Sequence, residues 1–168
     1  MRESPRVRRL KTEHREMSEL MSSSSLVCFE CSGSPPTSYT VQLSCKGLAI
    51  WNNKIVISDS HAFEILLGDD FPYNAPKIAW MTPVLHPNIK PPDVCLGDHW
   101  YPGSSIARIC EAIIEMVQFK SFNVYDPLNK EAAQWLVIQL ESETVGFPVD
   151  PRPIRDLDFE VVPQNPTT

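Results

Sequence analysis

The sequence predicts an α+β fold: an N-terminal helix, a four-stranded antiparallel meander sheet, a long loop and then two helices. Apolar residues recur at three- and four-residue spacing near the start of the chain, as on one face of an amphipathic helix. Short strand-like segments separated by turns follow between residues 26 and 81, which is typical of a meander. Two helical patterns return after residue 103, so helices and strands are segregated along the chain.

The first helix is expected over roughly residues 5–21, and a serine run at 22–25 ends it. Its apolar face contains Val7, Leu10, His14, Met17 and Met21. Basic residues cluster on the same segment: Arg2, Arg6, Arg8, Arg9 and Lys11. Such a cluster is either a solvated helix face or a docking surface for an acidic partner.

Four strands are expected in the meander. They are Leu26–Cys31, then Ser38–Ser44 with an extension toward Ile50, then Ile55–Ile57 continued by Ala62–Leu67, and finally Lys77–Met81. Asn52 and Asn53 indicate a hairpin turn, because asparagine tolerates a positive φ. Residues 58–60 interrupt the third strand.

Residues 82–103 have no clear period and contain five prolines. Long irregular loops in compact domains are usually functional or disordered, and this density of proline favours a rigid loop. The second helix is expected to begin near Ser104 as N-cap, and the third at Asp126-Pro127, with Asp126 as cap. These elements predict a domain over residues 1–145, followed by a Pro-rich tail over 146–168 that is draped on the body or mobile.

The 168 residues carry a net charge of −6 at pH 7, which makes a nucleic-acid partner unexpected. No apolar run approaches about 18 residues, so no membrane association is expected. Five cysteines without a secretory signal indicate reduced thiols and a cytoplasmic location. Cys28 and Cys31 form a CxxC pair, but a strand would point them to opposite faces. No metal site and no cofactor are therefore expected.

Cys95 is the candidate nucleophile, because cysteine is the strongest neutral-pH nucleophile among side chains and this one lies in the proline-rich loop. The other four cysteines lie in apparent strands or on an apolar helix face, where burial is expected. Upstream, Asn88 can donate to a developing oxyanion or hold the loop by hydrogen bonds to the backbone. His86 is either a loop anchor or a base. Asp126 can cap a helix or orient an incoming amine.

The order and spacing of several motifs resemble those of the ubiquitin-conjugating enzymes. The hallmark of that family is His-Pro-Asn followed by Cys-Leu, here His86-Pro87-Asn88 and Cys95-Leu96. Three further segments resemble family motifs: Phe71-Pro72-Tyr73-Asn74-Ala75-Pro76-Lys77-Ile78, Trp100-Tyr101-Pro102 and Asp126-Pro127-Leu128-Asn129. The resemblance covers roughly residues 5–142, and its several spaced motifs make it specific.

The resemblance implies that the chain is an enzyme. Such an enzyme accepts ubiquitin or a ubiquitin-like modifier from an activating enzyme as a thioester, here on Cys95, and passes it to a lysine of a substrate protein. A RING-type ligase usually assists. Asn88 and His86 would support the site, and Asp126 would lie near the incoming lysine. The residues in the positions of partner contacts are Arg8, Arg9, Tyr73, Trp100 and Pro102.

The sequence also departs from the family pattern. The gap between Asn88 and Cys95 is one residue shorter than usual, and about three residues are missing between Cys95 and Trp100. Leu85 replaces an aromatic residue, and the Tyr-x-Gly-Gly turn is absent. The tail replaces the usual final helices. These features resemble a prokaryotic branch of the family.

Three alternatives compete with this interpretation. One is a non-catalytic interaction module of the same fold, although such variants usually lack the cysteine that Cys95 provides. Another is a cysteine hydrolase using Cys95 with His86 or His99, which would need a histidine within hydrogen-bond reach of the thiol. The third, a redox protein using the CxxC pair, is disfavoured by strand geometry.

Overall fold

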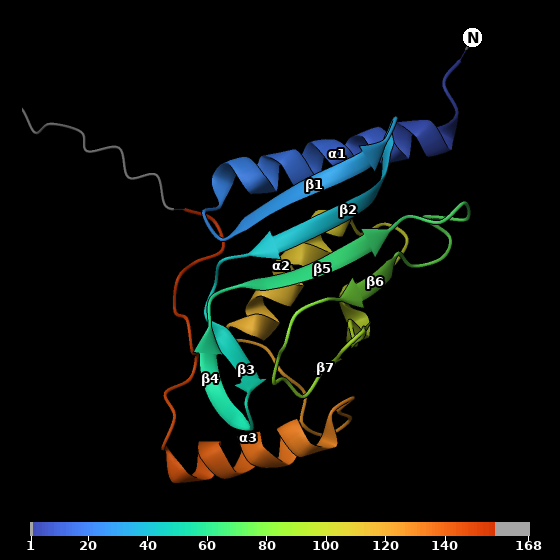
Figure 1. Cartoon of the computed structure of the whole chain (residues 1–168). Coiled ribbons are helices and arrows are strands. Elements are labelled where there is room, and N and C mark those ends of the chain that lie inside the picture. Colours follow the sequence, from blue (N-terminus) through green and yellow to red (C-terminus); the bar gives the residue numbers. More distant parts are fainter. Residues whose placement is uncertain (1, 157–168) are drawn as a thin grey trace, which may run out of the picture.

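The computed structural model describes residues 2–156. Two helices cover one face of a four-stranded antiparallel sheet (Figure 1). The sheet has the order β1-β2-β5-β6, formed by Val27–Gly33, Pro36–Leu43, His61–Leu66 and Lys77–Trp80. Helices α1 (Pro5–Ser23) and α2 (Ile106–Val117) lie against it, and α3 (Lys130–Ser142) lies at the opposite end from α1. The predicted α+β class and the order of helices and sheet are confirmed.

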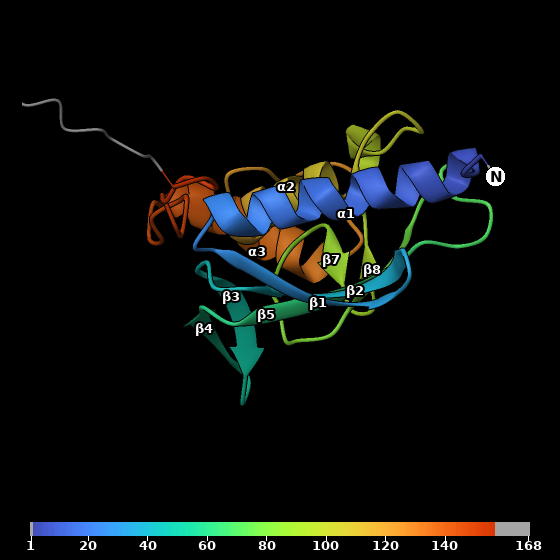
Figure 2. The ribbon, with the colours of Figure 1, turned by 90° about the horizontal axis from the view of Figure 1, so that it is seen from above.

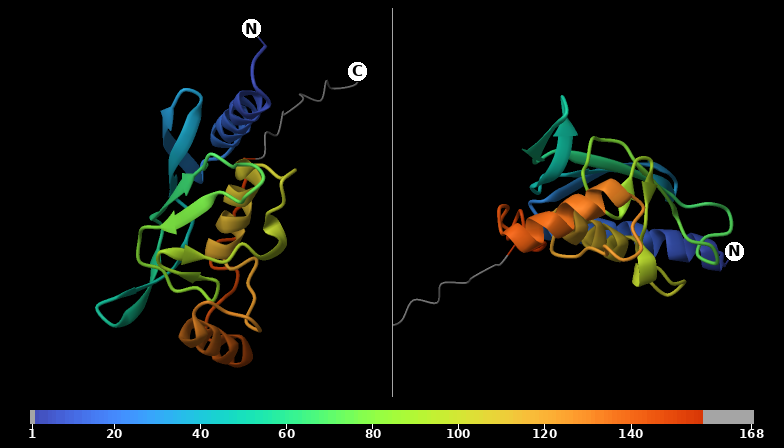
Figure 3. Two further views of the ribbon diagram at one scale, coloured as in Figure 1. Left: turned by 90° about the vertical axis from the view of Figure 1, so that its right-hand side faces the viewer. Right: turned by 90° about the horizontal axis from the view of Figure 1, so that it is seen from below.

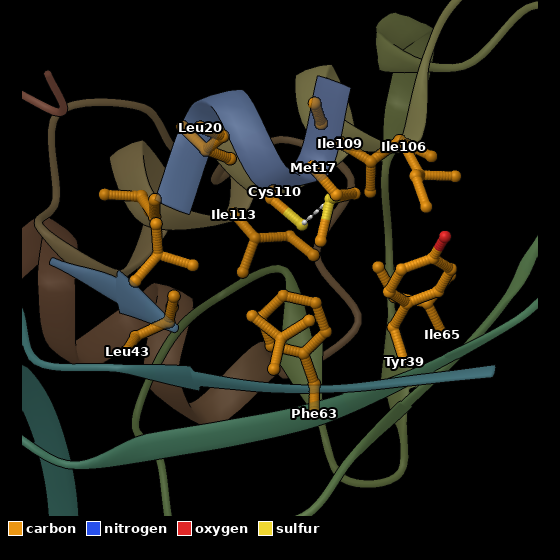
Figure 4. Close-up of a cluster of buried hydrophobic side chains, with 14 of the residues drawn as sticks. Met17, Leu20, Tyr39, Leu43, Phe63, Ile65, Ile106, Ile109, Cys110 and Ile113 are labelled. Atoms are coloured by element: carbon orange, nitrogen blue, oxygen red, sulfur yellow. Dashed lines mark hydrogen bonds between the residues drawn. The ribbon is translucent and has the colours of Figure 1, made fainter. Parts of the chain in front are cut away.

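Alternation along the strands builds the main core. In β2, Tyr39, Val41 and Leu43 point inward and are buried, because successive strand residues face opposite sides of a sheet. Figure 4 shows Tyr39 and Leu43 meeting side chains of α1 and α2. Between the two helices, the Cys110 thiol lies 3.7 Å from the sulfur of Met17. Most of α2 is buried, which explains why apolar residues occur on nearly all its sides.

The third predicted strand is wrong in one respect. Strands β3 (Gly47–Trp51) and β4 (Lys54–Ser58) form a separate hairpin that projects from the sheet (Figure 2). Of the two segments predicted to form the third strand, only the second, β5, pairs with β2. Asn52 and Asn53 adopt positive φ of 49° and 58°, as the predicted turn requires. At the start of this hairpin, Gly47 lies against the end of α2, where an added Cβ would lie 2.7 Å from the Val117 side chain.

The proline-rich loop is ordered by short pairings. Strands β7 (Ile89–Lys90) and β8 (Asp93–Val94) form a small hairpin, and a 3-10 turn, η1 (Gly97–His99), follows Cys95. The backbone N–H of Trp80 in β6 donates to the carbonyl of Pro92 at 2.8 Å, which attaches this hairpin to the sheet edge. The loop is therefore not structureless, and its order agrees with the rigidity that the prolines predicted.

Both predicted helix caps are displaced along the chain. Ser105, not Ser104, caps α2 and accepts the N–H of Arg108 at 3.3 Å. Asn129, not Asp126, caps α3 and accepts the N–H of Ala132 at 3.0 Å. Asp126 lies in the preceding turn, where its own N–H donates to the side chain of Asn123. Helix α3 consequently starts later than predicted.

The tail lies on the body as far as Asp156, and the predicted remainder, 157–168, is outside the described residues. The described part of the tail, up to Asp156, runs from α3 back toward α1 (Figure 3). The N–H of Val149 donates to the carbonyl of Gln118 at 2.9 Å, and the N–H of Asp156 donates to that of Ser23 at 2.8 Å. Within residues 2–156, no helix is long and apolar enough to cross a membrane.

Candidate functional site

Cys95 directly follows β8 and is half-buried. Its backbone N–H donates to the carbonyl of Asn88 at 2.9 Å, which fixes the distance between the two motifs. The residue lines a cavity of about 300 Å³. The other residues around this cavity are Asn88, Leu96, Gly97, Asp98, His99, Met116, Ser121, Phe122 and Asn123. The single candidate nucleophile of the loop is thus placed beside an open space that a reacting group can enter.

The side chain of Asn88 holds the two walls of this cavity together. Its Nδ2 donates to the carbonyl of Asn123 at 2.9 Å, and its Oδ1 accepts the N–H of Asn123 at 2.8 Å. This reciprocal pair uses the acceptor and one amide hydrogen, and leaves the second amide hydrogen available. Of the two roles considered for Asn88, the contacts show the loop-holding one; oxyanion donation would have to use the remaining N–H.

His86 is fully buried beneath the loop and does not line the cavity. Its Nδ1 accepts the N–H of Asn88 at 3.0 Å, and its ring lies 4.9 Å from that of Phe119. Burial lowers the pKa of His86 to about 3, so the imidazole is neutral near pH 7. These contacts favour the anchor interpretation of His86 over the base interpretation.

Asp126 is exposed and is not among the residues that line the cavity. It belongs to a turn that Asn123 organises, because Oδ1 of Asn123 accepts the N–H groups of Tyr125 and Asp126 at 2.9 and 3.3 Å. The acidic residue that does line the cavity is Asp98. In the sequence, Asp126 follows the cavity residue Asn123 by three positions.

The predicted partner residues gather where the start of α1 meets two loops. Arg6 donates to the carbonyl of Phe71 at 3.2 Å, and Arg9 donates to the carbonyl of Pro102 at 2.8 Å. Tyr73 is 88% exposed on the first of these loops, and Pro102 is exposed on the second. This arrangement forms one continuous end of the molecule from three separate segments.

The guanidinium of Arg9 is used internally, which the sequence did not predict. It pairs with buried Glu13, donates to the carbonyls of Pro102 and Ser104, and lies 5.2 Å over the ring of Phe71. Arg9 therefore joins the loop that contains Pro102 to α1. Its neighbour Arg8 is exposed. Trp100 is half-buried against Phe71, with ring centroids 5.7 Å apart, so its main contact is also internal.

Sequence reasoning missed the cavity residues that follow α2. Ser121, Phe122 and Asn123 lie far from Cys95 in sequence, and Met116, in the last turn of α2, lines the cavity with them. The burial expected for all four other cysteines is also wrong, because Cys28 and Cys31 are exposed on β1, at the sheet edge. Cys45 and Cys110 are buried, and burial raises the pKa of the Cys45 thiol to about 12.

Two kinds of chemistry find little support at this site. Within residues 2–156, no group of three His, Cys, Asp or Glu side chains could hold a metal ion. A hydrolase would need a histidine hydrogen-bonded to the thiol. Among the described residues, no hydrogen bond joins the Cys95 thiol to His86, whose Nδ1 accepts the N–H of Asn88, or to His99, which lines the same cavity. Cys95 therefore lines the cavity without a histidine hydrogen-bonded to its thiol.

Comparison with known families shows to which family the chain belongs. Residues 17–143 match the sequence model described as "Ubiquitin-conjugating enzyme". The chain belongs to the ubiquitin-conjugating enzyme family. It is 28% identical over 108 residues to the probable ubiquitin-conjugating enzyme E2 L460 of Acanthamoeba polyphaga mimivirus, covering 57% of this chain and 67% of that protein.

Other members of the ubiquitin-conjugating family match over shorter stretches. The NEDD8-conjugating enzyme ubc12 of Schizosaccharomyces pombe is 36% identical over 51% of this chain and 47% of that protein. The ubiquitin-conjugating enzyme E2 N of Drosophila melanogaster is 33% identical over 47% of this chain and 54% of that protein. The chain therefore spans about half the length of these two relatives.

The fold of a family member agrees as well. The E2 domain of a Toxoplasma gondii ubiquitin-conjugating enzyme superposes with a TM-score of 0.56 at 18% identity, covering 79% of this chain and 89% of that one. This likeness supports the fold alone. The resemblance seen in the motifs is thereby confirmed at the level of family and fold.

Proposed function

We propose that this chain conjugates ubiquitin or a ubiquitin-like modifier to lysine through a thioester on Cys95. The observation that carries the proposal is the place of Cys95, half-buried at the wall of a cavity and tied through its N–H to Asn88. The two relatives that conjugate ubiquitin and NEDD8 make both modifiers candidates.

The reaction has two acyl transfers. In the first, the Cys95 thiolate attacks the C-terminal carbonyl of the modifier on the activating enzyme. A carbon–sulfur bond to Cys95 forms, and the bond to the donor cysteine breaks and releases that thiolate. In the second, a neutral lysine amine attacks the new thioester. A carbon–nitrogen bond forms, Cys95 leaves as a thiolate, and the amine loses a proton.

Asn88, His86 and Asp126 take different parts in this scheme. Asn88 keeps the cavity in shape through Asn123, and its second amide hydrogen is available to the oxyanion. His86 positions Asn88 from below through its Nδ1. The exposed carboxylate of Asp126 orients or deprotonates the incoming lysine when the substrate protein closes over the site.

The end formed by α1 and its two loops is the proposed docking site for the activating enzyme and a RING-type ligase. Tyr73, Pro102 and Arg8 are its exposed members. Arg9 and Trp100 act from behind this surface by holding the loops. The surface combines apolar and cationic groups, which suits a partner with an apolar pocket rimmed by acidic residues.

A loading assay tests the proposal. The chain is mixed with ATP and with ubiquitin or NEDD8, each with its own activating enzyme, and analysed on a non-reducing gel. The expected result is a band shift with one modifier that disappears with reductant. Cys95→Ser should instead retain a reductant-resistant oxyester. Absence of a shift with every modifier would favour a non-catalytic interaction module, and histidine-dependent hydrolysis of a peptide substrate would favour a cysteine hydrolase.

A further inference from the structure

The chain leaves α2 through an unusual residue, Phe119, which directly follows the C-cap Gln118. Phe119 has a φ of +59°, in the left-handed region that glycine normally occupies after a helix. Its N–H donates to the carbonyl of Met116 at 2.9 Å, and the N–H of Lys120 donates to that of Glu115 at 2.9 Å, which closes the helix. A bulky residue keeps such a backbone only where its surroundings hold it, and positions of this kind concentrate at functional sites.

The surroundings hold Phe119 through its ring, which is packed among other side chains. It is 3% exposed and belongs to a small second core, separate from the main one, between α3 and the loops of the site. Its centroid lies 4.9 Å from that of His86, 5.3 Å from that of Phe147 and 6.3 Å from that of Phe122. Phe119 thus touches the ring that anchors Asn88, a residue of the cavity wall, and the C-terminal tail.

The direction of the chain after Phe119 decides the shape of the cavity. Residues 121–123 line the cavity together with Cys95, and Asn123 makes the reciprocal hydrogen bonds with Asn88. An ordinary helical φ at Phe119 would continue α2 and carry these residues away from Asn88. The left-handed turn is therefore a geometric requirement of the site, and the packed ring is the contact that keeps it.

We propose that Phe119 is a positioning residue for the Cys95 site and that Phe147, in the tail, is the clamp that holds its ring. Under this proposal the tail has a function: Phe147 packs against the ring of Phe119 and thereby keeps the cavity wall in place. The effect on catalysis rests on the proposed function of Cys95, whereas the effect on the Asn88–Asn123 pair does not.

The test measures hydrogen exchange at the amide of Asn123, which donates to Oδ1 of Asn88 at 2.8 Å. Phe147→Ala removes the clamp and leaves every cavity residue in place. The expected result is a loss of protection at Asn123 of about 10-fold or more beyond the change at core amides such as Ile65. Phe147→Tyr keeps a ring and should restore wild-type protection.

Phe29→Ala is the matched control, because Phe29 is also a half-buried phenylalanine but packs against the ring of Tyr39 in the main core. Phe29→Ala should lower the protection of all core amides without a larger loss at the amide of Asn123. If Phe147→Ala lowers protection at Asn123 and Ile65 equally, the tail only stabilises the fold and the proposal is overturned. Unchanged protection at Asn123 overturns it as well.

A second readout links the clamp to chemistry. In single-turnover discharge to free lysine, Phe147→Ala should lower the rate at saturating lysine by about 10-fold and leave the half-saturating lysine concentration unchanged, because small misplacements of reacting groups slow the chemical step. A rise in that concentration alone would contradict the positioning role. If no thioester forms on wild-type protein, the proposed function fails, and the exchange result still decides whether Phe147 positions Asn123.

Discussion

Replacing Asp150 with asparagine is expected to lower the free energy of unfolding by about 2 kcal/mol. Asp150 is only 1% exposed. Its carboxylate accepts the N–H of Lys46 at 2.8 Å and pairs with Nε and Nη2 of Arg152 at 3.0 and 2.7 Å. It therefore attaches the C-terminal tail to the connection between β2 and β3.

The magnitude follows from the exposure of the two partners. Removing one partner of a fully buried ion pair costs about 3–5 kcal/mol. The side chain of Arg152 is 48% exposed, so water solvates the guanidinium that remains and reduces this cost. Asparagine also keeps an oxygen that can accept the N–H of Lys46. The remaining loss of about 2 kcal/mol corresponds to a decrease in Tm of about 4–8 °C for a domain of this size.

The contribution of Asp150 depends on pH. The hydrogen bonds from Arg152, with its charge, hold the pKa of this carboxyl well below its usual range. A depressed folded-state pKa stabilises the fold fully above the unfolded-state pKa of about 4, and the contribution is lost as the pH falls further. The difference between wild type and Asp150→Asn should therefore be constant down to about pH 5 and shrink below about pH 4.

Urea unfolding followed by circular dichroism at pH 7 and at about pH 3 measures both effects. Asp69→Asn is the control, because Asp69 is exposed, and a surface change of this kind alters stability by less than about 0.5 kcal/mol. A variant at Asp150 as stable as this control at pH 7 would refute the role of the buried carboxylate. A deficit that persists unchanged at pH 3 would refute its electrostatic origin.

Three further outcomes test the proposed site. Asn88→Ala should lower the free energy of unfolding by about 2 kcal/mol, measured with urea, and slow discharge, because it leaves the backbone groups of Asn123 unpaired; unchanged stability would contradict the loop-holding role. Asp126→Ala should load normally on the gel but discharge to free lysine about 10-fold more slowly, whereas Asp69→Ala should match wild type; equal rates would remove Asp126 from the mechanism. Tyr73→Ala should weaken binding of a cognate ligase in calorimetry by about 10-fold, and Trp51→Ala, an exposed aromatic on the projecting hairpin, should not.

Local patterns in the sequence predicted the parts of the fold that local physics decides. The spacing of apolar residues correctly placed Leu10 and Met17 on the buried face of α1, and alternation in β2 gave its inward side. Met21 was wrongly placed on that face: it is 38% exposed, and Leu20 is buried instead. The turn at Asn52 and Asn53 followed from backbone preferences. The break at residues 58–60 was visible, but nothing local showed that it separates two sheets. The separation depends on pairing between distant segments, since β2 pairs with β5 whereas β3 and β4 pair only with each other.

The errors at the site come from contacts between distant segments. Asp126 and Asn129 are both good helix caps, and the backbone of Asn129 is tied to the His-Pro-Asn loop by its N–H, which donates to the carbonyl of Pro87 at 2.9 Å. Arg9 looked like a free basic residue, yet the two carbonyls that it binds lie more than ninety positions away. Motifs identified Cys95 and Asn88, whereas Asn123 and Phe119 acquire their roles only when the chain is folded.

The most direct test of the central claim is the intact mass of the chain after reaction with ATP, a ubiquitin-like modifier and its activating enzyme. Wild type and the double variant Cys28→Ala, Cys31→Ala should gain the mass of one modifier less one water, and lose it when a thiol is added. Cys95→Ala should gain nothing. An adduct on Cys95→Ala, or its absence when the two exposed cysteines of β1 are removed, would contradict the account.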